Sequence, residues 1–117
     1  MIGFVPQSDL LWEEMTAAEN LLLFCKIKGV LPEDIPPTID ELLTNVNLID
    51  VKDARVSTFS HSMKRKLSLA IASIGDPRVI LLDEPTSGLD NEPRNEVWTM
   101  IQKLRKNRAI ILTTNSV

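Results

Sequence analysis

Short apolar runs alternate with helical periodicity along this chain and predict a mixed α/β fold. Residues 2–5, 79–82 and 109–113 are apolar runs of strand length, which suit strands buried on both faces of a parallel sheet. Residues 39–46 and 63–74 place apolar side chains on one face of a helix. The order of helices and strands favours parallel pairing.

Capping signals locate the ends of the first helices. Thr16 to Glu19 matches a capping box, which predicts a helix from there to about Lys28, with Gly29 as its stop. Thr38 to Glu41 is a second match and predicts another helix start. The loop before it is marked by three prolines, Pro32, Pro36 and Pro37.

The second half of the chain predicts two more helices. Ser60 or Ser62 can cap a helix that continues to about Ile74, and Asp90 can cap one over residues 91–106. Residues 16–57 are expected to be largely helical and to form a subdomain.

Composition narrows the function classes. The chain has 117 residues, about one domain, and its net charge of −3 gives no electrostatic case for nucleic acid. No apolar run approaches the ~18–20 residues of a transmembrane helix. Cys25 is the single cysteine, so an internal disulfide is excluded, and it is expected to be a buried hydrophobe.

Two adjacent carboxylates, Asp83 and Glu84, directly follow the second apolar run. Ligands of open α/β sheets bind at the carboxyl ends of the strands, so both acids are expected at the binding edge. Two carboxylates there suit a divalent metal ion and an activated water beside a phosphate. The pattern indicates a nucleotide-hydrolysing domain.

With its neighbours, this stretch resembles the nucleotide-binding domain of ATP-binding cassette (ABC) proteins over nearly the whole chain. The matching motifs come in the order of that family: Pro6-Gln7 resembles the Q-loop, 59–68 the signature motif, 79–84 Walker B, 87–90 the D-loop and 113–115 the switch loop. Finer details resemble the A subfamily, whose members are mostly membrane proteins that move lipids or sterols. These details are Met63-x-Arg65-Lys66-Leu67-Ser68, Ile27-Lys28-Gly29 and Arg108-x-Ile110-Ile111-Leu112.

The resemblance implies a partial P-loop NTPase (RecA-like) parallel sheet core with a helical subdomain. Residues 1–15 would be the Q-loop region, and 16–75 the helical subdomain with the signature helix. Residues 76–117 would be the core that carries Walker B, the D-loop and the switch loop.

The resemblance also assigns roles in Mg-ATP hydrolysis. Asp83 would support Mg²⁺, Glu84 would polarise the attacking water, and Gln7 would reach both the metal and the water. Ser60 and Ser62 of the signature motif would contact the phosphate bound on a second nucleotide-binding domain. Asp90 would lie at that dimer interface, or act as a plain N-cap.

Two departures from the family pattern bear on activity. His61 and Ser62 stand where the family has two glycines, and we expect the His61 side chain to face solvent or the partner. Asn115 stands where the family has the switch histidine. Asparagine donates a hydrogen bond but cannot become cationic, so we expect slow hydrolysis.

Other residues keep more than one interpretation. The basic cluster Lys64-Arg65-Lys66 is expected to form a solvated helix face, with weak attraction for phosphate as the alternative. Trp12 and Met15 would face a membrane domain by resemblance, or be buried in the helical subdomain.

The glycine-rich phosphate loop G-x-x-x-x-G-K-[ST] does not occur in the chain. By resemblance we expect it upstream, and we expect the 117 residues alone to bind ATP poorly. A missing central strand would leave Ile80 and its neighbours unpaired on one side, so the isolated chain should be marginally stable and prone to aggregate.

The leading interpretation is part of the ATPase domain of an A-type ABC transporter. It would pair head to tail with a second such domain, contact transmembrane domains, and lie on the cytoplasmic face of a membrane without crossing it. The alternatives are a soluble ABC-type ATPase and a truncated, non-catalytic interaction module.

Overall fold

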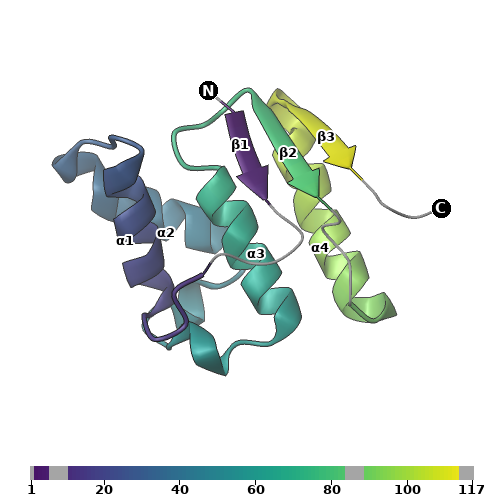
Figure 1. Cartoon of the computed structure of the whole chain (residues 1–117), viewed down its shortest axis with the longest axis horizontal. Helices are drawn as coiled ribbons and strands as arrows, with labels where there is room; N and C mark the ends of the chain where they lie inside the picture. The colour runs from purple at the N-terminus through teal and green to yellow at the C-terminus, as the bar shows by residue number, and fades with distance from the viewer. Residues whose placement is uncertain (1, 6–10, 84–88, 114–117) are drawn as a thin grey trace.

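Three parallel strands form one sheet in the computed structural model, which describes residues 2–5, 11–83 and 89–113 (Figure 1). The strands are β1 (Ile2–Val5), β2 (Val79–Asp83) and β3 (Ala109–Thr113), in the order β1-β2-β3. Ile80 of β2 is in register with Gly3 of β1 on one side and with Ile110 of β3 on the other. The expectation that Ile80 is unpaired on one side is therefore wrong, because both neighbours of β2 come from this chain.

Helix α3 occupies the middle of the molecule (Figure 1). It packs against α1 and α2 on one side and against β1 and α4 on the other. The arrowheads of the strands and the N-termini of α3 and α4 face the same end of the molecule. The helices are α1 (Ala17–Ile27), α2 (Ile35–Asn45), α3 (His61–Ala72) and α4 (Asn91–Leu104), joined by short 3-10 turns at Pro32–Asp34, Ile49–Val51, Val56–Thr58 and Arg105–Asn107.

The first predicted capping box is confirmed. Thr16 Oγ1 accepts a hydrogen bond from the Glu19 N–H at 3.1 Å, and Glu19 Oε1 accepts one from the Thr16 N–H at 2.9 Å. Helix α1 is followed by Gly29 at φ +80°, a conformation that glycine adopts without steric cost.

The second predicted capping box is wrong, because α2 begins at Ile35 and Thr38 lies within it. Pro36 and Pro37 occupy its first turn, where the missing N–H groups of proline would have no intrahelical partner in any case. The expected buried face survives this shift, since Ile39 and Leu43 are both buried.

The core is one connected cluster drawn from the sheet and from all of these helices. Ile80 and Leu82 of the central strand are 0% exposed, as are Leu67 of α3 and Val97 of α4. Cys25 is buried in the same cluster, as expected. Within the described residues no helix is both long enough and apolar enough to cross a membrane.

Candidate nucleotide-binding site

Asp83 is the last residue of the central strand and lies in register with Thr113 at the end of β3. Asp83 therefore stands at the carboxyl edge of a parallel sheet, the edge where α/β folds bind ligands, and its role at such a site stays a prediction. A carboxylate oxygen is a ligand that Mg²⁺ accepts, so a carboxylate-bearing residue at this edge fits the expected metal by its chemistry.

Gln7, Glu84 and Asn115 lie outside the described residues. Each follows within two residues of a strand that ends at this same edge: β1 ends at Val5, β2 at Asp83 and β3 at Thr113. Because the three strands are parallel, they all end at this one edge, and the catalytic roles expected for the residues that follow them stay predictions.

Ser60 and Ser62 meet at the N-terminus of α3. Ser60 is the N-cap, its Oγ accepts from the Met63 N–H at 3.2 Å, and the two hydroxyl oxygens lie 3.2 Å apart. The N-terminus of a helix carries partial positive charge and N–H donors, so this pair suits an anionic oxygen. His61 is exposed, in agreement with the expectation that its side chain faces outward.

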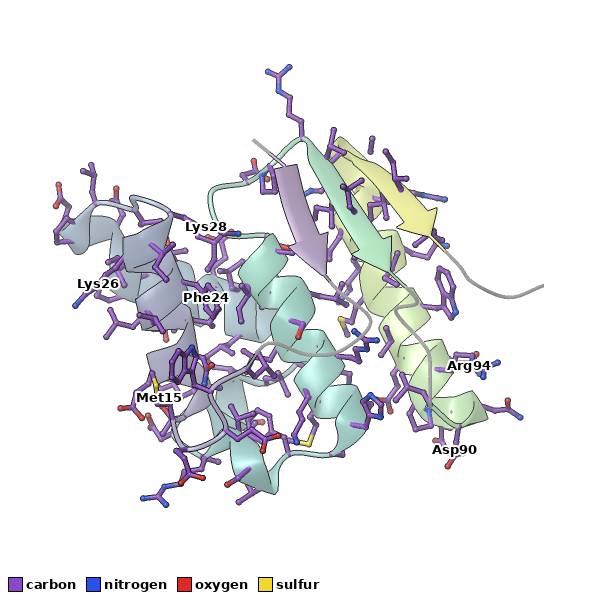
Figure 2. All side chains as sticks on the ribbon, in the orientation of Figure 1. Met15, Phe24, Lys26, Lys28, Asp90 and Arg94 are labelled. Carbon is purple, nitrogen blue, oxygen red and sulfur yellow. The ribbon has the colours of Figure 1, made fainter. Side chains whose placement is uncertain are left out.

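Asp90 is at the N-cap position of α4, but its side chain makes no capping hydrogen bond. It is exposed, and Figure 2 shows it with Arg94 at the first turn of α4. Arg94 Nη2 donates to the Leu89 carbonyl oxygen at 3.3 Å. No hydrogen bond or ion pair joins Asp90 to Ser60 or Ser62 in the described part of the chain, so its role at a dimer interface stays a prediction.

The basic cluster at the start of α3 is not the solvated face expected from the sequence. Arg65 is 1% exposed and Lys66 is 8% exposed. Lys66 Nζ lies 2.7 Å from Glu96 Oε2 of α4, and Lys64 is paired with Glu13 in the segment before α1. These charges join the signature helix to its neighbours, because burial of a cation is tolerated where a partner balances it.

The segment that leads into α3 is hydrogen-bonded to the segment that leads into α1. The Val56 N–H donates to the Met15 carbonyl at 3.0 Å, and the Ser57 N–H donates to the Glu13 carbonyl at 2.9 Å. The Ala18 N–H donates to the Lys52 carbonyl at 3.0 Å. Residues 13–18, which come soon after Gln7, are thereby tied to the segment that precedes Ser60.

Asn20 has a structural role that sequence reasoning missed. It is 0% exposed, its Nδ2 donates to the carbonyls of Trp12 and Thr16, and its Oδ1 accepts from the Trp12 N–H at 2.9 Å. The nitrogen and the oxygen of the Asn20 amide are thus both hydrogen-bonded, and these bonds hold the loop that contains Trp12. The Trp12 residue itself is 58% exposed. The sequence signal for this role is Asn20 itself, a polar residue on the otherwise apolar face of α1.

Lys28 links the C-terminal ends of α1 and α3. Its Nζ donates to the Ile71 carbonyl oxygen at 2.9 Å, and Figure 2 shows the side chain at the end of α1 nearest α3. A cation at the C-terminus of a helix is favourable because the last carbonyls carry partial negative charge. Burial lowers the pKa of Lys28, while the nearby Cys25 opposes this shift. Burial also raises the pKa of the Cys25 thiol, partly offset by Lys28.

Comparison with known proteins agrees with this arrangement. Residues 1–87 match the ABC transporter family. The whole chain is 47% identical to ABC transporter A family member 11 and 48% identical to member 9 of Arabidopsis thaliana, and covers 12% of each. It is 44% identical to ABC transporter A family member 9 of Dictyostelium discoideum, of which it covers 14%.

The chain therefore spans about one eighth of the length of these relatives, and its similarity to them lies within an ATP-binding domain. Membership in such a domain implies the P-loop NTPase fold, and the parallel sheet fits that fold. The chain belongs to the ABC transporter family and is similar along its whole length to A-family members.

Proposed function

We propose that this chain forms part of a nucleotide-binding domain that couples Mg-ATP binding and hydrolysis to the movement of lipid across or within a membrane. One observation carries the proposal: the paired central strand β2 ends at Asp83, followed by Glu84. The match of residues 1–87 to the ABC family supports the same activity. Because the chain covers only 12% of its relatives, lipid as the substrate rests on the A-family resemblance alone.

The proposed roles follow from the chemistry of each group. Asp83 and Gln7 hold Mg²⁺, which when bound neutralises charge on the phosphate oxygens. Glu84 orients the attacking water. Ser60 and Ser62 donate to the phosphate of a nucleotide held by a second nucleotide-binding domain, with Asp90 at the interface between the two.

Large exposed apolar side chains before α1 and at its C-terminal end support contact with a partner in the membrane-spanning part of a transporter. Trp12 is 58% exposed, Ile27 is 67% exposed and Leu31 is 57% exposed. Exposed aromatic and aliphatic groups of this size are typical of contact surfaces. In this proposal the segment lies on the cytoplasmic face of the membrane, and the division into 1–15, 16–75 and 76–117 describes its parts.

The test compares ATP turnover of the complete protein with that of the Glu84→Gln variant. We expect ATP binding to persist and turnover to fall about 10²–10³-fold, because one transition-state contact is lost. Glu14→Gln, the same change at an exposed residue, is the matched control and should leave turnover unchanged. Equal turnover in wild type and Glu84→Gln would contradict the proposal.

A second candidate function is a non-catalytic interaction module, for which the exposed Ser60 at the N-terminus of α3 would be a contact point. In that case this chain would capture an intact nucleotide-binding domain through Ser60 and the D-loop without any turnover of its own. Pull-down of such a domain by the chain, lost in Ser60→Trp, distinguishes this function from catalysis.

A further inference from the structure

A cationic hollow lies between the C-terminal halves of α2 and α4, with a volume of about 290 Å³. We call it the α2–α4 hollow, and it is lined by Asn45, Val46, Met100, Lys103, Leu104, Lys106 and Arg108. Arg108 immediately precedes β3, so it lies at the amino edge of the parallel sheet, whereas Asp83 ends β2 at the carboxyl edge. The hollow is therefore distinct from the nucleotide site.

Arg108 has donors that the described residues do not satisfy. Its Nη2 lies 2.6 Å from Asp76 Oδ1, and its side chain is 13% exposed. Its Nε and Nη1 atoms are buried and have no hydrogen-bond partner among the described residues. Guanidinium N–H groups buried without an acceptor cost free energy, so a turn of the Arg108 side chain that brings them to an oxygen ligand in the hollow would be favourable.

The charge of the hollow favours a dianion over a monoanion. Lys103, Lys106 and Arg108 line it, no carboxylate does, and neither lysine forms an ion pair within the described ranges. Asp76 offsets the charge of Arg108, which leaves the two lysines to be balanced. A phosphate group carries close to two negative charges at neutral pH and offers several acceptor oxygens.

Apart from Asn45, the rest of the lining is aliphatic. Val46 is 2% exposed and Met100 is 5% exposed, and Leu104 packs partly buried against the same core. Pockets that combine an apolar lining with a few convergent polar groups are typical of small-molecule sites. An apolar body attached to the phosphate would therefore contact Val46, Met100 and Leu104.

We propose that the α2–α4 hollow is an anion site that binds a phosphate group, held by Arg108 and by the ammonium groups of Lys103 and Lys106. The phosphate could belong to a free small anion or to an amphiphile. The proposal does not depend on the function proposed for the carboxyl edge of the sheet, and it predicts binding that persists when that edge is occupied.

The experiment measures binding of octyl phosphate, inorganic phosphate and octanoate to the complete protein by calorimetry, with excess Mg-ADP present to occupy any nucleotide site. The test variant is Lys103→Gln/Lys106→Gln, because both side chains are exposed and the fold should tolerate their change. The matched control is Lys26→Gln/Arg105→Gln, which removes two exposed charges outside the hollow.

We expect the test variant to weaken octyl phosphate binding about tenfold or more, since two charge-assisted hydrogen bonds are lost, and the control to change it less than about twofold. Tighter binding of octyl phosphate than of inorganic phosphate would assign the site to an amphiphile, and equal binding would assign it to a free anion. Equal weakening by both double variants, octanoate binding as tight as octyl phosphate, or no binding in the presence of Mg-ADP would overturn the proposal.

Discussion

The ammonium group of Lys66 lies 2.7 Å from Oε2 of Glu96 and joins the signature helix α3 to α4, the helix that follows the D-loop. The Lys66 side chain is 10% exposed and that of Glu96 is 51% exposed, so the cation is the buried member of the pair. Among the described residues Glu96 is the ion-pair partner of this ammonium group, and water also reaches that carboxylate. Any change at Glu96 therefore acts mainly on Lys66.

We predict that Glu96→Gln destabilises the complete protein by about 1 kcal/mol, because it leaves a largely buried ammonium without its counter-charge. Urea unfolding measured on wild type and variant gives this difference. Glu41→Gln makes the same change at an exposed helical position with no ion pair in the described part of the chain, and should cost less than about 0.5 kcal/mol. Equal costs at the two positions would show that the pair contributes nothing.

The Lys66–Glu96 pair is an example of a contact that could not be predicted from the sequence. Strand positions followed from apolar runs, and the start of α1 followed from Thr16 and Glu19, because both signals are local. The burial of Arg65 and Lys66 could not be predicted, since charged residues are seldom fully buried and their partners come from distant segments. Glu96 is 30 positions from Lys66 along the chain.

Proline caused the clearest error in the predicted elements. The sequence predicts Pro36 and Pro37 in a loop, yet they lie in the first turn of α2, which does not need their N–H groups. The expectation that Ile80 has no paired strand on one side was also wrong. Strand order depends on contacts between residues far apart in sequence, and no local pattern indicates that β2 lies between β1 and β3.

Lys28 gives a prediction about pH. Burial holds the pKa of its ammonium below its ordinary value of 10.5, so between the folded pKa and 10.5 the unfolded chain binds more protons at this position than the folded one. The contribution of Lys28 to the free energy of unfolding therefore increases as pH rises through that window. We expect the stability of wild type relative to Lys28→Met to increase as pH is raised toward 10.5.

The measurement is urea unfolding of both proteins at a series of alkaline pH values. Cys25 contributes the opposite trend, because its raised pKa makes the folded state lose stability as pH rises past the unfolded value of 9.0. Cys25 is present in both proteins, so the comparison isolates most of the Lys28 effect. Lys26→Met, a change at an exposed position of the same helix, should show no trend relative to wild type. A difference that shrinks with rising pH for Lys28→Met would contradict the assignment.

Asn115 leads to a prediction about rate. It stands two residues after β3, where the resemblance to the ABC family implies a switch histidine that contacts the γ-phosphate. We predict that Asn115→His raises ATP turnover of the complete protein, with an upper bound of about 10²–10³-fold for restoring one transition-state contact. The measurement is steady-state phosphate release at saturating Mg-ATP. Asn115→Gln keeps the amide and should leave turnover low, and an unchanged rate in Asn115→His would rule out this cause of slow hydrolysis.

The exposed edge of β3 leads to a prediction about the isolated 117-residue chain. β3 is an edge strand of the sheet formed by the described residues, and Ile111 is 49% exposed while Leu112 is 40% exposed on it. An apolar edge strand with free N–H and C=O groups is a template for pairing with another chain. We predict that the isolated chain self-associates through β3 and that Ile111→Lys suppresses this association, because a lysine on an edge strand would have to be desolvated on pairing. Light scattering across a concentration series measures the effect.

Ile27→Lys places the same charge at a 67% exposed position on α1 and should suppress association much less. Equal suppression by both variants would mean that net charge, rather than the β3 edge, controls association, and a monomeric wild-type chain with a sharp reversible thermal transition would remove the premise altogether.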